Sequence, residues 1–186
     1  MTVVFDEDAS FDIEIPVIVI GAGACGIVAA LAASEAGAEV LILERDEIPQ
    51  GSTALSSGMI PACNTRLQQA QGIDDTVDLL AADIHRKSKG RADAHVVDAV
   101  CRESGPAVEW LIDQHDVPLQ LVDSFLYPGH SVFRMHAPPS KTGAELIGAL
   151  TNAAAAAGID ILTNSRVTHL IAATDETIRG VEIERP

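Results

Sequence analysis

Aromatic side chains are scarce in this sequence of 186 residues, which contains four Phe, one Trp and one Tyr. Basic residues are also few, because 12 Lys and Arg stand against 27 Asp and Glu, and the formal net charge is −15. Such a charge repels nucleic acids and anionic membrane surfaces, so neither is expected as a partner. The hydrophobic fraction of 47% excludes a disordered chain, and with so few aromatic residues it favours helices packed closely on a sheet.

Cysteine is equally sparse. Cys25, Cys63 and Cys101 follow one another at intervals of 38 residues, which matches neither a disulfide framework nor the short spacings of a zinc site. We therefore expect reduced, mostly buried thiols and a cytoplasmic protein. The uncharged stretch 15–34 is almost long enough to cross a bilayer, but three glycines and a proline divide it and acidic residues precede it. We expect no membrane association.

The first part of the chain has the pattern of a βαβ unit. A β-branched run over 15–20 precedes a glycine turn at 21–26, and an Ala- and Leu-rich helix is predicted over 24–35 with Gly37 as its left-handed cap. A second buried strand is expected over 39–43. The right-handed crossover of such a unit makes its two strands parallel, so the fold class is α/β with a Rossmann-like parallel sheet.

Periodicity and capping residues divide the remainder of the chain into further elements. The segment 123–140 contains several Pro and Gly residues and is expected to be a long loop, a kind of segment that is often functional. Helices are predicted over 77–89, 95–103, 108–115 and 141–157, strands over 118–122 and from Ile161, and an antiparallel hairpin over 166–172 and 177–184.

The glycine turn Gly21-Ala22-Gly23-Ala24-Cys25-Gly26 matches the G-x-G-x-x-G pattern between a buried strand and a helix. In this context Gly21 permits the tight turn, Gly23 lets backbone amides approach a pyrophosphate, and Gly26 allows the helix to pack closely on the strand. The N-terminus of the helix then favours bound phosphate. No Gly-Lys-Ser/Thr follows, which excludes the phosphate loop of nucleotide hydrolases.

Glu44 follows Gly21 by 23 residues and ends the second predicted strand. A carboxylate at this place accepts hydrogen bonds from a ribose diol. A free 2′-hydroxyl is implied, which favours FAD or NAD over NADP. A glycine turn without a ligand is the alternative, and the full strand–turn–helix context disfavours it.

The segment from Glu44 to Met59 (ERDEIPQGSTALSSGM) resembles the extended FAD fingerprint of the fumarate reductase and succinate dehydrogenase flavoprotein family, which includes flavocytochromes c and 3-ketosteroid dehydrogenases. In that family an acidic residue is followed by a Gly-Gly-Ser/Asn-Thr stretch and then by small residues under the flavin. The resemblance implies an FAD-dependent oxidoreductase that moves a hydride between flavin N5 and a C–C or C=C bond of a small organic acid or steroid-like substrate. The alternatives are an NAD-dependent dehydrogenase and a truncated, non-catalytic dinucleotide-binding module.

The same resemblance assigns roles to individual residues. It implies contacts of Ser52 and Thr53 with the pyrophosphate or ribityl chain, of Ser57 to Met59 with the isoalloxazine, and of the Val167 backbone with the adenine. The complete set of expected cofactor-binding residues is Gly21, Gly23, Ala24, Gly26, Glu44, Arg45, Gly51, Ser52, Thr53, Ser57, Gly58, Met59 and Val167.

The segment 133–138 resembles an Arg-x-His-x-Pro segment of the family's substrate-capping region. The resemblance implies that His136 binds a substrate carboxylate, whereas chemistry alone favours a surface histidine. Arg134 and Lys141 are candidates for further positive charge toward an anionic substrate, with solvated surface charge as the alternative. The six histidines show no metal-type spacing, so no metal is expected.

Three departures from the family pattern shape the remaining expectations. Gln50 replaces the first glycine of the usual pair, and Ser52 stands where succinate dehydrogenases carry the His that is bonded to flavin, so non-covalent FAD is expected. Family chains are also much longer, which suggests a fragment or a site completed by a second chain. We expect a flexible leader over 1–13, an incomplete Rossmann-like FAD-binding domain over 14–122 and 141–186, and at 123–140 a loop that begins the substrate-capping region.

Overall fold

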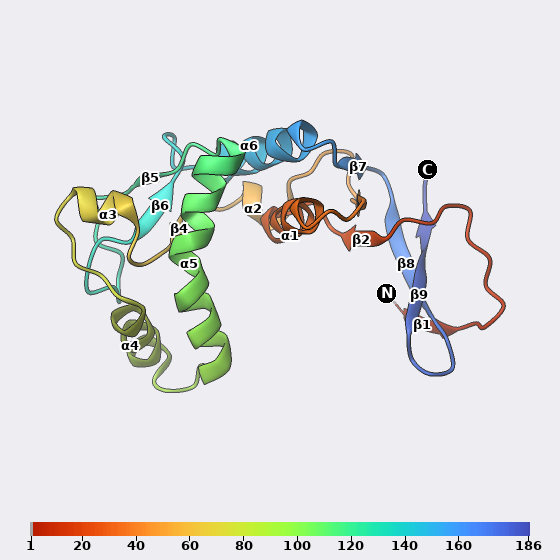
Figure 1. Cartoon of the computed structure of the whole chain (residues 1–186), viewed down its shortest axis with the longest axis horizontal. Helices are drawn as coiled ribbons and strands as arrows, with labels where there is room; N and C mark the ends of the chain where they lie inside the picture. The colour runs from red at the N-terminus through yellow and green to blue at the C-terminus, as the bar shows by residue number, and fades with distance from the viewer. Residues whose placement is uncertain (1) are drawn as a thin grey trace. The chain divides into compact units, whose positions relative to one another are not determined.

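The structure, a computed structural model, describes residues 2–186 (Figure 1). The chain divides into two compact units. Unit 1 contains the described residues up to Thr53 together with Leu150–Pro186, and unit 2 contains Ala54–Ala149. This division differs from the expected one, in which the loop 123–140 was set apart from a single domain.

Unit 1 contains the βαβ unit. Strand β2 (Val17–Ile20), helix α1 (Ala24–Glu35) and strand β3 (Val40–Leu43) follow one another, and β7 (Asp160–Leu162) completes a sheet of order β2-β3-β7. Both pairings are parallel, as predicted. Ile27 and Leu31 of α1 are fully buried, because the apolar face of the helix covers this sheet.

The hairpin of unit 1 is formed by β8 (Arg166–Ala172) and β9 (Ile178–Glu184), as predicted. Strand β1 (Thr2–Phe5) pairs in parallel with the outer edge of β8, so the sheet order is β1-β8-β9. The leader expected to be flexible over 1–13 therefore contains a strand that pairs with the hairpin. Backbone pairing holds β1 although its four side chains are exposed, and for that reason its sequence shows no burial pattern.

Unit 2 combines helices with a small sheet. Strand β6 (Met135–Ala137) lies in this sheet between β4 (Ile60–Pro61) and β5 (Gln120–Leu121), and both pairings are antiparallel. The strand β6 lies within the stretch that was expected to be a loop. The short helix α2 (Gly51–Ala54) lies at the boundary between the units, and the short helix α3 (Arg66–Ala70) follows β4. The longer helices are α4 (Val77–Ser88), α5 (Ala94–His115) and α6 (Gly143–Ala156), and α6 continues into unit 1.

Helix α5 corrects the prediction of two separate helices over 95–103 and 108–115. The helix runs without interruption through Gly105 and Pro106. A Cβ at residue 105 would lie 2.4 Å from the carbonyl oxygen of Cys63, so this glycine permits close packing and does not mark a helix end. Burial of Cys101 and Val108 on either side supports the helix across the proline, which lacks an N–H.

A buried ionic network connects α4 to β6 in unit 2. The guanidinium of Arg134 is completely buried and donates two hydrogen bonds to Asp75, at 3.0 and 2.9 Å, and one of 2.9 Å to Asp83. Asp83 also accepts hydrogen bonds of 2.7 Å from the amide and the hydroxyl of Ser131. Burial acts to raise the pKa of Asp83, but the hydrogen bonds from Ser131 and Arg86 and the charge of Arg134 outweigh it and lower the pKa to about 2.

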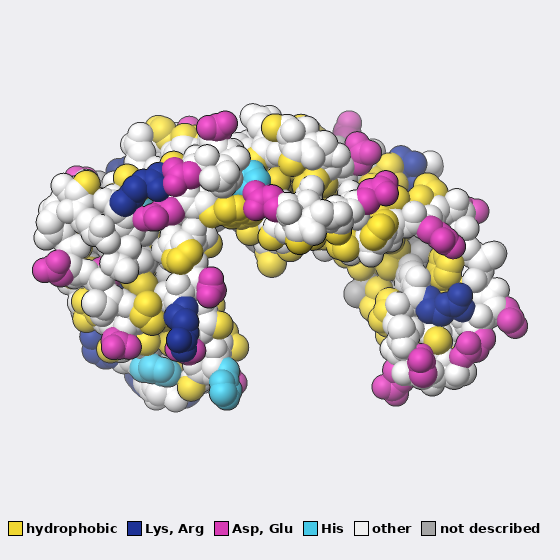
Figure 2. Space-filling model, viewed as in Figure 1, with side chains coloured by type: hydrophobic (Ala, Val, Ile, Leu, Met, Phe, Trp, Pro, Cys, Tyr) yellow, Lys and Arg dark blue, Asp and Glu magenta, His cyan; other side chains and the backbone are white. Residues whose placement is uncertain are grey.

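Surface charge and cysteine state agree with the composition. Figure 2 shows Asp and Glu side chains on both units, with fewer Lys and Arg. All three cysteines are free thiols, with Cys63 and Cys101 buried and Cys25 exposed. Within residues 2–186, the structure contains no helix that is both long and apolar enough to span a membrane.

Replacing Arg134 by Met should destabilise unit 2 strongly, because Asp75 and Asp83 would be left buried without their partner. The expected loss in free energy of unfolding is about 3–5 kcal/mol. The matched control is Arg102→Met, which removes an exposed ion pair with Asp98 and should cost less than about 1 kcal/mol. Fluorescence of Trp110, the only Trp, reports the unfolding of unit 2. Equal losses in both variants would contradict a stabilising role of the buried network.

The low pKa of Asp83 makes unit 2 sensitive to acid. Because the folded value of about 2 lies below the ordinary value of 3.8, the ionised carboxylate contributes its full stability above the ordinary value and loses it as the pH falls toward the folded value. Urea unfolding followed at Trp110 between about pH 5 and about pH 2 should therefore show falling stability. Asp83→Asn should reduce this pH dependence, and a slope unchanged by the substitution would contradict the assignment to Asp83.

Candidate cofactor site

The glycine turn lies between β2 and α1 and depends on glycine at two positions. Gly21 has a φ of +100°, a conformation that other residues rarely adopt, and its amide donates to the carbonyl of Leu43 at 2.8 Å. A Cβ at Gly26 would lie 1.9 Å from the carbonyl oxygen of Gly21. The side chain of residue 26 must therefore be absent for α1 to begin this close to β2.

Gly23 differs, because the protein itself would tolerate a side chain there. An added Cβ would meet only the Thr53 hydroxyl at 3.7 Å, an ordinary van der Waals distance, and φ is −77°. Gly23 is the N-cap of α1, and as a glycine it offers no side chain to cap the helix. Packing within the chain does not explain this glycine, whereas close approach of a phosphate to the helix N-terminus does.

A cavity of about 420 Å³ opens beside the turn, entirely within unit 1. Seven of the predicted cofactor-binding residues line it. They are Gly21, Gly23, Glu44, Arg45, Gly51, Ser52 and Val167. Four lining residues were not among the predictions, and each lies next to a predicted residue or two positions from one. They are Ile20, Asp46, Ser165 and Arg166.

Glu44 is held in a defined orientation at the wall of this cavity. Its side chain is buried, and its two carboxylate oxygens accept hydrogen bonds from the amides of Ala22, at 2.7 Å, and Asp46, at 3.0 Å. The backbone of Glu44 is also fixed, because its amide donates to Leu162 and its carbonyl accepts from Ser165. A carboxylate has about four acceptor positions, so two remain for the hydroxyls of a ribose.

Ala24 and Thr53 meet at the start of α1. The amide of Ala24 donates to the Thr53 hydroxyl at 3.1 Å, so Thr53 occupies one of the free amides of the first helical turn. Arg45 is exposed, and its only ion pair in the described part of the chain is a 3.6 Å contact with the neighbouring Asp46. Its guanidinium therefore remains available to a ligand in the cavity.

The other predicted flavin contacts, Ser57, Gly58 and Met59, belong to unit 2. Gly58 has a φ of +62°, and a Cβ there would lie 2.6 Å from the carbonyl oxygen of Thr142. This glycine therefore permits the turn to pack against the start of α6. Met59 packs on the buried cluster that contains Val122 and Met135.

His136 lies in the interior of unit 2. Its side chain is completely buried, with Nδ1 3.0 Å from the carbonyl of Arg134 and Nε2 3.0 Å from the Thr65 hydroxyl. Burial lowers the pKa of the imidazole below its ordinary value, which favours the neutral form. Nδ1 must then carry the proton that the carbonyl accepts, and the Thr65 hydroxyl donates to Nε2. A substrate carboxylate would reach His136 only after this hydrogen bond opened and the side chain became exposed.

Arg134 and Lys141, the two cations expected near an anionic substrate, both have protein partners in the structure. Arg134 is the buried centre of the network with Asp75 and Asp83, so its charge is compensated inside unit 2. The Lys141 ammonium is exposed and donates to the hydroxyl of Ser124 at 3.2 Å. The sequence could not reveal the burial of Arg134, because both of its carboxylate partners are more than 50 residues distant. Within residues 2–186, no cluster of His, Cys, Asp or Glu is arranged to hold a metal ion.

Comparison with known proteins connects this geometry to a family. A family model described as FAD binding domain matches residues 16–186. The chain is 32% identical over 169 residues to the probable fumarate reductase Ifc3 of Shewanella frigidimarina, a match that covers 90% of this chain and 28% of the relative. It is also 32% identical over 170 residues to a urocanate reductase of Eggerthella lenta, covering 91% and 28%. This chain thus spans less than a third of the length of either relative.

Solved structures show the same relationship. The open conformation of a flavocytochrome c3 fumarate reductase superposes with a TM-score of 0.83 at 32% identity, covering 91% of this chain and 30% of that one. A 3-ketosteroid dehydrogenase from Rhodococcus jostii has a TM-score of 0.81 at 23% identity and shows the shared fold. The glycine turn, the buried Glu44 and the match over 16–186 together show that the chain belongs to the FAD binding domain family, among flavoproteins of the fumarate reductase type, with FAD as its cofactor.

Proposed function

We propose that this chain is the FAD-holding part of an oxidoreductase that reduces a C=C bond, or oxidises the corresponding C–C bond, of a small organic acid or steroid-like substrate. The observation that carries the proposal is the cavity in which the N-terminus of α1 and the buried Glu44 lie together. The names of the two curated relatives support the acid class, because fumarate and urocanate are both unsaturated carboxylic acids.

Different residues around the cavity are proposed to bind different parts of FAD. The amides of Gly21, Ala22 and Ala24 already donate within the chain, so the close approach at Gly23 and the positive end of α1 are proposed to favour the pyrophosphate, and Glu44 is proposed to accept from the adenosine ribose. The backbone of Val167 is proposed to meet the adenine, and Ser52 the pyrophosphate or ribityl chain. Because residue 52 is a serine, which cannot form the histidyl bond to flavin, we propose non-covalent binding.

When bound, FAD supplies a two-electron centre that exchanges a hydride with carbon. The chain's own residues bind and orient it. Ser57 to Met59 are proposed to approach the isoalloxazine, and the packing of Gly58 on Thr142 fixes the backbone of that turn. The match to an FAD binding domain favours this function over an NAD-dependent dehydrogenase.

Substrate turnover requires exposed side chains that bind the substrate, and the two candidates for this role are not exposed. Both His136 and Arg134 are completely buried and have protein partners for their polar atoms. We therefore propose that the 186-residue chain binds FAD but needs further residues, from a longer chain or a second one, for turnover. The three free cysteines support a reducing compartment such as the cytoplasm.

The function is tested by the visible spectrum of the purified 186-residue chain, after addition of FAD and removal of the unbound cofactor. A flavin spectrum is expected, and acid precipitation should release all of the flavin into the supernatant. Flavin that stays with the precipitate would contradict non-covalent binding. A colourless chain that is stabilised against heat by NAD and not by FAD would contradict the proposed cofactor role.

Gly23→Ala separates cofactor binding from folding. Because the new methyl group has van der Waals room, the free energy of unfolding should fall by no more than about 1 kcal/mol, the usual cost of Ala at a helix N-cap. FAD affinity should fall about tenfold or more, because forcing a methyl group into a close contact costs about 1–3 kcal/mol. Flavin fluorescence titration measures the affinity, and chemical denaturation measures the stability.

Gly26→Ala is the matched comparison for this prediction. Its methyl group would overlap the Gly21 carbonyl, so it should destabilise unit 1 whether or not FAD is present. If Gly23→Ala bound FAD as tightly as the unchanged chain, the proposed approach of the pyrophosphate at Gly23 would be wrong.

A further inference from the structure

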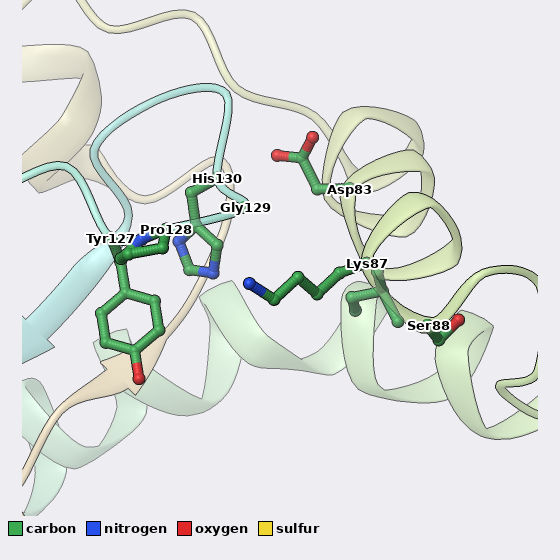
Figure 3. A pocket seen from close by; sticks show the side chains of 8 residues that line it. Asp83, Lys87, Ser88, Tyr127, Pro128, Gly129 and His130 are labelled. Carbon is green, nitrogen blue, oxygen red and sulfur yellow. The ribbon is translucent and has the colours of Figure 1, made fainter.

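A second cavity, of about 290 Å³, lies within unit 2 and shares no residue with the cofactor cavity. Its walls are α4, which contributes Ile84 and Lys87, and the loop from Tyr127 to His130 (Figure 3). Most of its lining is apolar. The volume is at the small end of the range for ligand pockets, which suits a molecule of about one ring.

The two walls of this cavity are joined by hydrogen bonds. Arg86 donates to the carbonyl of Gly129 at 2.9 Å, and the amide and hydroxyl of Ser131 bind Asp83. Gly129 has a φ of +100°, and a Cβ there would lie 3.0 Å from the Lys87 side chain. The loop is thereby held against α4, so the cavity is formed in advance of any ligand.

Lys87 carries the uncompensated charge at this cavity. Asp75 and Asp83 are the nearby carboxylates, and both are engaged by Arg134, with Arg86 as a further cation on Asp83 at 2.6 Å. Three cations thus face two carboxylates. Within residues 2–186 no carboxylate pairs with the Lys87 ammonium, and Figure 3 shows the side chain extending toward His130 while the Asp83 carboxylate points away.

His130 adds no charge of its own at neutral pH. Burial, followed by the nearby charge of Arg134, lowers its pKa below the ordinary 6.5, so the imidazole is neutral. Its ring is tilted by 45° against that of Tyr127, with centroids 5.5 Å apart, and the two rings form one aromatic side of the cavity. One positive charge therefore stands beside an aromatic wall.

The sequence also shows that positive charge is concentrated around Lys87. Arg86, Lys87, Lys89 and Arg91 are four of the chain's 12 basic residues and fall within six positions, although the net charge is −15. Compensation of the helix dipole at the end of α4 explains basic residues there in general. It does not explain why one of them extends over an apolar cavity.

We propose that this cavity binds a small monocarboxylate with a flat apolar body, with its carboxylate at Lys87 and its body between Ile84 and the Tyr127–His130 wall. The inference is independent of the proposed oxidoreductase function, because the site lies wholly within unit 2 and requires no flavin. A neutral molecule of the same shape should bind more weakly because it lacks the ionic contact with Lys87. A small inorganic anion should also bind more weakly because it lacks the apolar contact with the cavity walls.

The test is a titration of the ¹⁵N-labelled 186-residue chain with benzoate, followed by amide shifts in two-dimensional NMR spectra. Saturable shifts are expected at Lys87, Gly129 and His130. Lys87→Gln should weaken benzoate binding about fivefold, the effect of one exposed ionic contact. Lys89→Gln is the matched control. Lys89 lies two residues after Lys87 and carries the same charge, but its side chain does not line the cavity, so its replacement should leave the affinity for benzoate unchanged.

Benzamide and inorganic phosphate complete the test, and both should bind more weakly than benzoate. Benzamide binding as tight as benzoate would show a purely apolar cavity and overturn the proposal. Phosphate binding as tight as benzoate, or an equal loss in Lys89→Gln, would show diffuse attraction to the basic cluster and also overturn it. Benzoate that produces no saturable shift at the three residues would exclude the site.

Discussion

The close approach of α1 to β2 is the constraint on which the cofactor site depends. It exists because residue 26 has no side chain to collide with the carbonyl of Gly21. The same approach places the amide of Ala22 on the Glu44 carboxylate and the start of α1 at the cavity. One steric condition therefore sets together the positions of the start of α1 and of the Glu44 carboxylate, the two groups proposed to hold the pyrophosphate and the ribose.

Unit 2 depends on an interaction of a different kind. Arg134, Asp75 and Asp83 are buried charges, and each would be costly to bury without the others. Their hydrogen bonds hold Arg134, just before β6, against Asp75, just before α4, and Asp83 within α4. Asp83 also binds Ser131 and so brings the loop of Ser131 onto the same helix. This arrangement also explains why Lys87 is left without a carboxylate, since the nearest ones already have partners.

The two units differ in how much of them could be predicted. The βαβ unit was predicted with its parallel pairing and the bounds of α1, because adjacent segments form it and glycine positions mark its turn. The pairing of β1 with β8 joins segments more than 160 residues apart, and the exposed side chains of β1 carry no signal. Helix α5 was predicted as two helices because Gly105 and Pro106 usually end a helix, and the partner that makes the glycine necessary, Cys63, is distant in the chain.

The sequence by itself determined the fold class, the glycine turn, the acidic residue after the second strand and the resemblance to FAD-binding flavoproteins. All of these depend on short-range order, in which residue type, spacing and local conformation are directly coupled. Only the tertiary structure decided which polar side chains face solvent and which face one another. The family resemblance makes His136 a candidate for substrate binding, and its charge makes Arg134 one. Both are nevertheless interior groups, because their partners Asp75, Asp83 and Thr65 come from segments whose proximity arises only when the chain folds.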